Sequence, residues 1–215
     1  MRPEVMRHML EENIGLITVR QVAEGIFNHC FITDSIVESR ITISNKGIGY
    51  VFPLYLFKDE ERMDLFSQNA PGKEPNISED LLRRLMVVYH HEPQPEEILH
   101  YIYGILFNPI YRNTYNQFLR IDFPRVPFTV DYDLFQSIAV LGQKLIDLHL
   151  LKSAELNQPI AKYQGDGDDH TIIKPRYEES EQRVYINSSH YFEGIPPELW
   201  QYQIGGYQLL DKYLK

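Results

Sequence analysis

The sequence predicts an α+β fold, with a mainly β N-terminal part followed by a helical part that ends in a few short strands. Between residues 15 and 57, short runs rich in Val, Ile, Thr and aromatic side chains alternate with turn residues, which is typical of strands. Between residues 78 and 148, apolar side chains instead recur every three or four positions, which is typical of amphipathic helices. Because strands and helices are grouped rather than alternating, the pattern favours α+β.

The N-terminal strands are predicted from β-branched composition and from the turn residues between them. Four short runs fit this description: 15–20, 30–33, 35–37 and 41–44. The run 50–57 is nearly all apolar, which suits a central strand buried on both faces. Pro53 points the other way, because proline cannot donate to a ladder and prefers an edge or a bulge.

Three main helices are predicted from their start signals and apolar stripes. Ser78 is a good N-cap for the first, Pro93 and Pro95 precede the second, and Asp131 precedes the third. The predicted buried faces are Leu81, Leu82, Leu85, Met86 and Tyr89, then Ile98, Tyr101, Ile102, Ile105 and Leu106, and finally Leu134, Ile138, Leu141, Leu145 and Leu148. The C-terminal part is predicted to hold a polar loop at 162–170, short strands at 171–173 and 183–186, a helix opened by Pro196 and Pro197, and a last helix at 207–214.

These elements predict one domain with three parts. Residues 1–58 form the mainly β part, 59–77 a polar linker, and 78–215 a mainly helical region that packs on the first part. The length of 215 residues is enough to bury a sizeable core. A single cysteine, Cys30, excludes an internal disulfide and suits the reduced cytoplasm. The start lacks the apolar run of a signal peptide, and no stretch approaches the roughly 18 apolar residues of a membrane span.

The charge balance argues against a free-standing binder of duplex DNA. Lys plus Arg number 21 and Asp plus Glu number 30, which gives a net charge of −9, whereas DNA binders usually present a basic face. Residues 1–58 nevertheless carry six basic and six acidic side chains, so the whole acidic excess lies downstream. If DNA is bound, the N-terminal part is therefore the better candidate surface.

Several short motifs invite a catalytic interpretation that a plainer one outweighs. Residues 108–111, Asn-Pro-Ile-Tyr, look like the Asn-Pro-Pro-Tyr motif of adenine methyltransferases, but Asn108 is also a good N-cap with Pro109 at the first helical position. The loop 166–170, Asp-Gly-Asp-Asp-His, offers oxygen ligands for a hard cation but lacks calcium-loop spacing, which favours a solvated acidic loop. The histidines at 90, 91 and 100 have no cysteine beside them and favour a structural role over zinc.

Three longer regions carry a resemblance to a known family. The first is Gly-Tyr-Val-Phe-Pro-Leu-Tyr-Leu-Phe at 49–57. The second is Tyr-Ile-Tyr-Gly-Ile-Leu at 101–106, continuing through Tyr-Arg at 111–112 to Phe-Leu-Arg-Ile-Asp-Phe-Pro-Arg-Val-Pro-Phe at 118–128, and the third is Glu-Leu-Trp at 198–200 followed by Ile-Gly-Gly-Tyr-Gln-Leu-Leu at 204–210. Together they resemble the C-terminal specificity domain of type ISP restriction–modification enzymes. The resemblance implies a non-catalytic reader of duplex DNA. It also implies that an adjacent adenine methyltransferase and a helicase-like nuclease motor use S-adenosylmethionine, ATP and magnesium in the parent chain.

Base readout requires side chains that pair donors and acceptors, and the resemblance gives such residues at strand ends a function. Arginine binds guanine through two bonds, and asparagine or glutamine binds adenine likewise. The candidates are Arg20, Gln21, Asn28, Ser39, Arg40, Asn45 and Lys46. The plainer alternative pairs Arg20 with Glu24 and Arg40 with Glu38 at the surface. The alternative for the whole chain is a scaffold whose helices dock neighbouring domains or a protein partner.

Overall fold

The computed structural model describes residues 3–22, 25–39, 48–57, 72–204 and 207–215, and it confirms the α+β fold. The chain divides into two compact units, Met1–Ser153 and Ala154–Lys215, here called unit 1 and unit 2. The boundary between them lies well downstream of the linker predicted at 59–77. Strand β5, Lys73–Pro75, lies inside that predicted linker and pairs with the strand before it, Tyr55–Phe57, within unit 1. The three-part division of the sequence stays a prediction.

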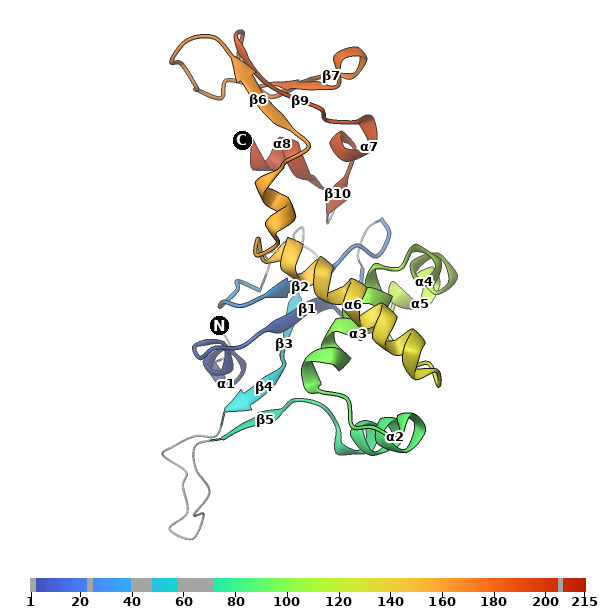
Figure 1. Ribbon diagram of the computed structural model, residues 1–215. Coiled ribbons are helices and arrows are strands. Elements are labelled where there is room, and N and C mark those ends of the chain that lie inside the picture. Colours follow the sequence, from blue (N-terminus) through green and yellow to red (C-terminus); the bar gives the residue numbers. More distant parts are fainter. Residues whose placement is uncertain (1–2, 23–24, 40–47, 58–71, 205–206) are drawn as a thin grey trace. The chain divides into compact units, whose positions relative to one another are not determined.

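Unit 1 is built on a three-stranded antiparallel sheet (Figure 1). The central strand is β1, Gly15–Val19, which lies between β2, Cys30–Thr33, and β3, Gly49–Pro53. A short helix α1, Pro3–Met6, and a 3₁₀ turn at Arg7–Met9 precede the sheet. The strand β4, Tyr55–Phe57, then pairs with β5, Lys73–Pro75.

The prediction of one central strand over residues 50–57 is wrong. The run is divided into β3 and β4 at Leu54, whose N–H donates to the carbonyl of Ile14 outside the ladder at 2.7 Å. Strand β3 is an edge strand that ends at Pro53, as expected for a residue that cannot donate a ladder bond. The run 35–37 is not a strand, and the strand predicted at 41–44 lies outside the described residues.

Five helices complete unit 1, and the predicted starts of the three longest are confirmed. They are α2, Glu79–Tyr89, α3, Pro95–Phe107, α4, Pro109–Thr114, α5, Asn116–Leu119, and α6, Tyr132–His149. The Ser78 hydroxyl accepts from the N–H of Leu81 at 3.2 Å, and Asp131 Oδ1 accepts from the N–H of Leu134 at 3.1 Å. Helix α3 begins with a capping box. These caps use side chains within three residues of the helix start, so the sequence alone predicts them.

The buried face of α6 differs from the predicted stripe. Phe135, Ala139, Gly142 and Ile146 are buried, whereas Leu134 and Leu141 are 48% and 59% exposed. The cause is a close approach to α3, because a Cβ atom on Gly142 would lie 1.9 Å from the carbonyl oxygen of His100. Only glycine fits there, so the small residues of α6, rather than its leucines, face α3.

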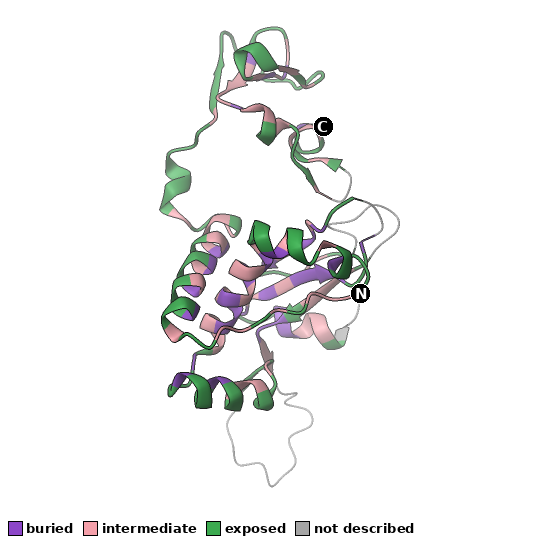
Figure 2. Cartoon of the chain, turned by 90° about the vertical axis from the view of Figure 1, so that its right-hand side faces the viewer, coloured by how far each residue is buried: buried purple, intermediate pink, exposed green. Residues whose placement is uncertain are grey.

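The core of unit 1 joins the sheet to α3 and α6 (Figure 2). Buried residues from the sheet side, including Val19, Phe27 and Cys30, form one cluster with Tyr103 of α3 and Ile146 of α6. A second cluster packs α2 against α3 and α6 around Phe135. The three-stranded sheet is thus held firmly at its centre, and its polar strand ends lie outside this core.

Unit 2 contains a four-stranded antiparallel sheet in the order β6-β9-β8-β7. Its strands are β6, Lys162–Gly165, β7, Arg176–Glu178, β8, Arg183–Tyr185, and β9, His190–Glu193. A 3₁₀ turn at Ala154–Asn157 precedes these strands, and another at Glu179–Glu181 lies between β7 and β8. After the sheet come helix α7 (Pro197–Trp200), the strands β10 (Gln203–Ile204) and β11 (Tyr207–Gln208), and helix α8 (Leu209–Tyr213). A small core of Val184, Ile186, Ile195 and Leu214 fills one side.

Three predictions for unit 2 need correction. The last helix, predicted at 207–214, spans Leu209–Tyr213 and follows strand β11 at Tyr207–Gln208. The segment 162–170, predicted as a loop, begins with strand β6, because Tyr163 pairs across the sheet with Phe192 at 5.1 Å between ring centroids. Residues 171–173 do not form a strand, although the N–H of Ile173 donates to the carbonyl of Ile186 at 2.9 Å. The predicted strand at 183–186 and the helix after Pro196 are confirmed as β8 and α7.

Candidate nucleic-acid interface

One end of the sheet in unit 1 gathers the described candidate residues. Arg20 and Gln21 follow β1, and Asn28 comes just before β2. The carbonyl of Ser39 accepts from the N–H of Gly49, the first residue of β3, at 2.7 Å. Thr18 pairs with Cys30 and Val19 with Gly49, so these strand ends coincide. We call Arg20, Gln21, Asn28 and Ser39 the sheet-end site. Arg40, Asn45 and Lys46 lie outside the described residues.

Arg20 is held by an exposed ion pair. Its Nε lies 3.1 Å from Oδ1 of Asp122, and the two side chains are 62% and 47% exposed. The backbone N–H of Phe123 and the Arg20 side chain both lower the pKa of Asp122. The described partner of Arg20 is thus Asp122, and Glu24, its partner in the plainer alternative, lies outside the described residues. Exposed pairs of this kind open readily, so the guanidinium of Arg20 is accessible to a ligand.

Asn28 has a structural contact that the sequence did not predict. Its half-buried Oδ1 accepts from Nη1 of Arg112 at 3.3 Å, and the Arg112 guanidinium stacks 4.5 Å from the ring centre of Phe107. Arg112 Nε also donates to the carbonyl of Leu106. The Asn28 amide is thus oriented by a cation that lies 84 residues away in the chain. Next to it, His29 is buried, and its burial lowers its pKa below the ordinary value.

Three arginines of the helical part join this end of the sheet. The N–H of Val22, just after the sheet-end site, donates to the carbonyl of Arg120 at 3.1 Å. Arg120 and Arg125 are exposed, and the charge of Arg125 acts on Asp122, the partner of Arg20. Residues 98–130 contain Arg112, Arg120 and Arg125 but only one acid, Asp122. The chain is acidic overall, yet its arginines exceed its carboxylates at this place.

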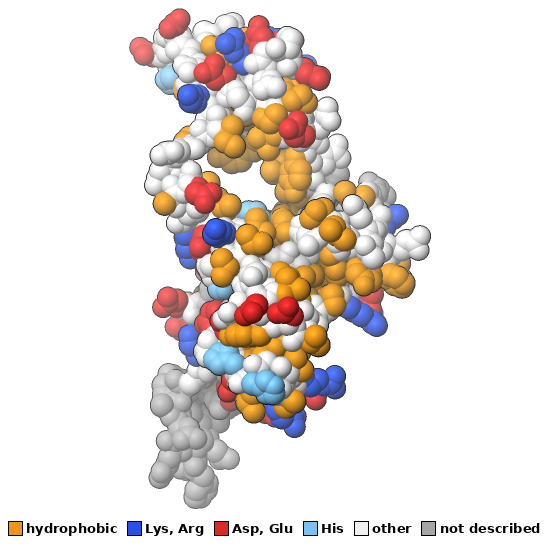
Figure 3. Space-filling view, turned by 45° about the vertical axis from the view of Figure 1, so that its right-hand side comes forward, with side chains coloured by type: hydrophobic (Ala, Val, Ile, Leu, Met, Phe, Trp, Pro, Cys, Tyr) orange, Lys and Arg blue, Asp and Glu red, His pale blue; other side chains and the backbone are white. Residues whose placement is uncertain are grey.

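An apolar groove of about 590 Å³ lies beside the arginines. It is lined by Tyr111, Tyr115, Phe118, Leu119, Ile121, Asp122, Phe123, Arg125, Val126 and Pro127. Phe118 and Ile121 are 67% and 63% exposed, and Figure 3 shows hydrophobic side chains gathered on the surface of unit 1. Tyr111 is buried, whereas Phe118 is exposed at the surface, which makes this a candidate contact region.

The short motifs have structural roles in the described residues. Asn108 Oδ1 accepts from the N–H groups of Ile110 and Tyr111 at 2.8 and 3.2 Å, so it caps α4 as the plainer interpretation predicted. Asp169 Oδ1 accepts from the N–H of Thr171 within its own loop. Among the described residues, no three His, Cys, Asp or Glu side chains form a group that would hold a metal ion. Nor does this part of the chain contain a helix long and apolar enough to cross a membrane.

Comparison with known proteins identifies the family. A family model described as the type ISP C-terminal specificity domain matches residues 1–215, so the chain belongs to that family. No curated protein matches the sequence.

Solved structures share the fold. The chain is similar to the ATP-dependent type ISP restriction–modification enzyme LlaBIII bound to DNA, with a TM-score of 0.71 and 20% identity over 95% of this chain and 13% of that one. For the DrdV–DNA complex the TM-score is 0.71 and the sequence identity 21%, over 99% of this chain and 20% of that one. For a nuclease-deletion mutant of the type ISP enzyme LlaGI in complex with a DNA substrate mimic, the TM-score is 0.65 and the identity 20%, over 94% of this chain and 16% of that one. The chain thus spans no more than a fifth of each of these proteins.

Proposed function

We propose that this chain recognises a short sequence in duplex DNA on behalf of a restriction–modification enzyme. The carrying observation is that the sheet-end site converges with Arg112, Arg120 and Arg125 at one end of unit 1. Membership of the specificity-domain family and the DNA-bound state of the similar solved structures support the same role.

The residue types at this end suit the two tasks of sequence recognition. Arg20 offers the two parallel donors that fit guanine, and Gln21 offers the donor and acceptor that fit adenine. Arg120 and Arg125, exposed and without the rigid hold of a cap or a core, suit phosphate contacts that fix the register. Asn28 can make a base contact when its Oδ1 exchanges the hydrogen bond from Arg112 for one from a base.

In this proposal the chain itself carries no catalytic step. Methylation of adenine with S-adenosylmethionine, and cleavage driven by ATP and magnesium, belong to neighbouring methyltransferase and helicase-like domains of the parent chain. Both activities act on cellular DNA, so the proposal places the chain in the cytoplasm. S-adenosylmethionine, ATP and magnesium are accordingly proposed to bind those neighbouring domains and not this chain.

The test replaces the two accessible readers in the intact parent enzyme and maps adenine methylation. Arg20→Ala and Gln21→Ala each remove one base contact, worth about 1–3 kcal/mol of discrimination. Each is expected to relax the methylated sequence at one position. Arg84→Ala is the matched control, because Arg84 also makes an exposed ion pair, with Asp80 at 2.8 Å in α2. An unchanged methylated sequence in both site variants would contradict the proposal.

A second candidate role has one observation in its favour. The apolar groove with its exposed Phe118 and Ile121 is suited to packing against another domain. A scaffold role predicts that Phe118→Ser lowers methylation yield without altering the sequence methylated. It also predicts that Arg20→Ala changes neither the yield nor the sequence.

A further inference from the structure

The sheet of unit 2 presents an outward face made of arginine and tyrosine. Directly paired residues share a face of an antiparallel sheet, so Arg176, Tyr185, Tyr191 and Gln164 form one row across the four strands. The alternate row, which includes Val184 and Phe192, faces the core of the unit. The first row therefore belongs to the opposite, uncovered face.

Each arginine on this face is stacked on a tyrosine. The guanidinium carbon of Arg176 lies 4.6 Å from the ring centre of Tyr185, and that of Arg183 lies 4.4 Å from the ring centre of Tyr191. The two rings are 5.2 Å apart. Stacking holds each guanidinium flat, so that its N–H groups point sideways toward solvent or neighbours. The arginines are thereby preorganised.

The two arginines differ in how many carboxylates hold them. Arg183 meets Glu181 at 3.2 Å through Nη1 and Glu193 at 3.7 Å through Nη2, and its side chain is 32% exposed. Arg176 forms one ion pair in the described part of the chain, with Glu178 at 3.2 Å through Nη1, and its charge also acts on Glu181; its side chain is 62% exposed. Arg176 therefore keeps N–H donors that point to solvent, whereas the carboxylates occupy both ends of the Arg183 guanidinium.

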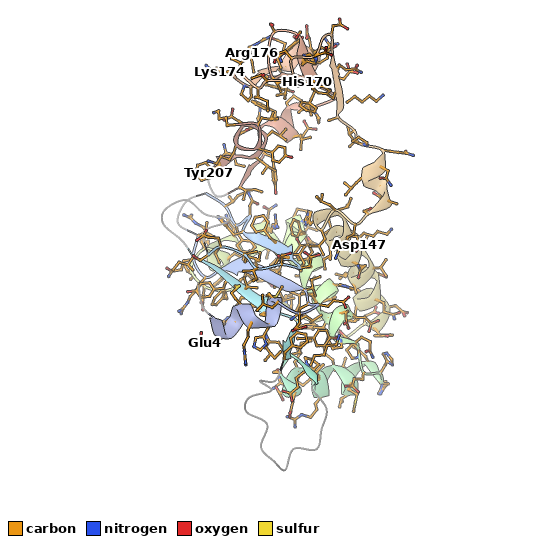
Figure 4. The ribbon with its side chains drawn as sticks, turned by 90° about the vertical axis from the view of Figure 1, so that its left-hand side faces the viewer. Glu4, Asp147, His170, Lys174, Arg176 and Tyr207 are labelled. Atoms are coloured by element: carbon orange, nitrogen blue, oxygen red, sulfur yellow. The ribbon has the colours of Figure 1, made fainter. Side chains whose placement is uncertain are left out.

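A shallow cavity of about 330 Å³ opens beside Arg176 at the edge strand β7. Its lining residues are Ile173, Lys174, Pro175, Arg176, Tyr185, Asn187 and Ser188. Two of these are cations, and none of these described residues is an acid. Figure 4 shows Lys174 and Arg176 close together on one side of unit 2. The backbone bond from Ile173 to Ile186 fixes the approach to this edge.

The polar groups of the cavity suit an anion and not a base. The one lining amide, Asn187, donates to the carbonyls of Asp169 and Thr171 and accepts from the N–H groups of Ser189 and His190. It is therefore occupied and presents no donor–acceptor pair to a base edge. Lys174, Arg176 and the Ser188 hydroxyl remain, and all three donate to phosphate oxygens.

We propose that Lys174 and Arg176 hold one backbone phosphate of duplex DNA, a contact that gives affinity regardless of sequence. This inference rests on the proposed function, because it takes DNA as the ligand. The contact is local. Residues 154–215 carry six basic and ten acidic side chains, so unit 2 as a whole repels DNA and the cradle is its favourable point. We call Lys174, Arg176 and Ser188 the phosphate cradle.

The experiment measures DNA affinity of the intact parent enzyme over a range of salt concentrations. Lys174→Gln combined with Arg176→Gln is expected to reduce the slope of log affinity against log salt by about 1, the loss for one phosphate contact. Affinity for the recognised and for a scrambled duplex is expected to fall by the same factor, with the methylated sequence unchanged. Lys162→Gln combined with Lys212→Gln removes the same charge elsewhere in unit 2 and is expected to leave the slope almost unchanged.

Two further arms identify the source of the phosphate. A duplex with one backbone phosphate replaced by neutral methylphosphonate is expected to weaken binding by the unaltered enzyme at one position. The cradle variant is expected to be insensitive to that replacement. The single change Lys174→Gln, at an exposed residue, serves if the double variant does not fold.

An unchanged salt slope in the cradle variant, or a loss equal to that of the control, would overturn the phosphate contact. Inorganic phosphate binding that disappears in the variant while DNA affinity is unchanged would assign the cradle to a free anion and overturn it as well. In both cases the proposed function would still stand if Arg20→Ala changes the DNA sequence that the parent enzyme methylates. Failure of the intact enzyme to bind DNA would instead overturn the proposed function together with this inference.

Discussion

The two units use similar polar residues in opposite ways. In unit 1, Arg20 and Gln21 lie past the end of a strand and are exposed. In unit 2, Asn187 also lies at a strand end, but four backbone groups already occupy its amide. The difference shows that residue type alone does not decide whether a polar side chain can contact a base. An amide suits base readout only if its donors and acceptors are available, whereas an exposed arginine suits a phosphate contact in either unit.

The largest expected effect is a loss of stability in unit 1 alone, caused by a substitution at Gly142. Gly142→Leu places side-chain atoms where even an added Cβ would lie 1.9 Å from the carbonyl oxygen of His100, so α6 is forced away from α3. A loss of about 3 kcal/mol in the free energy of unfolding is expected, measured by urea denaturation. Val140→Leu introduces the same side chain at a position that is 57% exposed and is expected to change stability by less than about 0.5 kcal/mol. Equal stability of the two variants would contradict the close packing described for unit 1.

The second largest effect is expected for Arg112, whose guanidinium orients the Asn28 amide. Arg112→Met removes its bonds to Asn28 and to the Leu106 carbonyl, so about 1–3 kcal/mol of stability is expected to be lost. Because the Asn28 amide is then unfixed, the methylated sequence is also expected to change at one position. Arg84→Met, at an exposed pair in α2, is the control. Loss of stability with an unchanged sequence would remove Asn28 from the sheet-end site.

A smaller effect concerns pH and falls on unit 1. Loss of hydration lowers the pKa of the buried His29 and of the half-buried His100 below their ordinary value near 6.5. The unfolded chain therefore binds protons at a higher pH than the folded unit. Their contribution to stability is fully present above about pH 6.5 and is lost as pH falls from there toward the lowered values. The urea midpoint of unfolding is expected to be lower at pH 5.5 than at pH 7.5. A midpoint that does not fall would contradict histidines that are neutral in the folded unit.

The smallest effect tests how the fold uses Ser39. Its described side-chain bond goes to Glu38 at 3.0 Å, and its carbonyl, which any residue provides, accepts from Gly49. Ser39→Ala is expected to change the free energy of unfolding by less than about 0.5 kcal/mol. A larger loss would show that the hydroxyl supports the start of β3. A changed methylated sequence at unchanged stability would make Ser39 a reader.

The sequence predicted what depends on near neighbours. The caps at Ser78, Asn108 and Asp131 act within three residues, so the helix starts follow from local pattern. The buried face of α6 does not, because it is set by the contact of Gly142 with a carbonyl on another helix.

The same limit applies to the candidate site. Strand ends are readable in sequence, so Arg20, Gln21, Asn28 and Ser39 were predicted as a group, and the structure brings them to one end of the sheet. The arginines of the helical part were missed, because a bond between Val22 and the carbonyl of Arg120 brings them there from about 100 residues away. An excess of arginine over acid in 98–130 was the available signal.

The most direct test exchanges the two units separately in the intact parent enzyme and maps adenine methylation across the genome. Replacing residues 1–153 with those of a relative that recognises another site is expected to move the methylated sequence to that of the donor. Replacing residues 154–215 is expected to keep the sequence and change only the salt dependence of binding. A methylated sequence that moves with the second exchange and not with the first would contradict the assignment of sequence reading to unit 1.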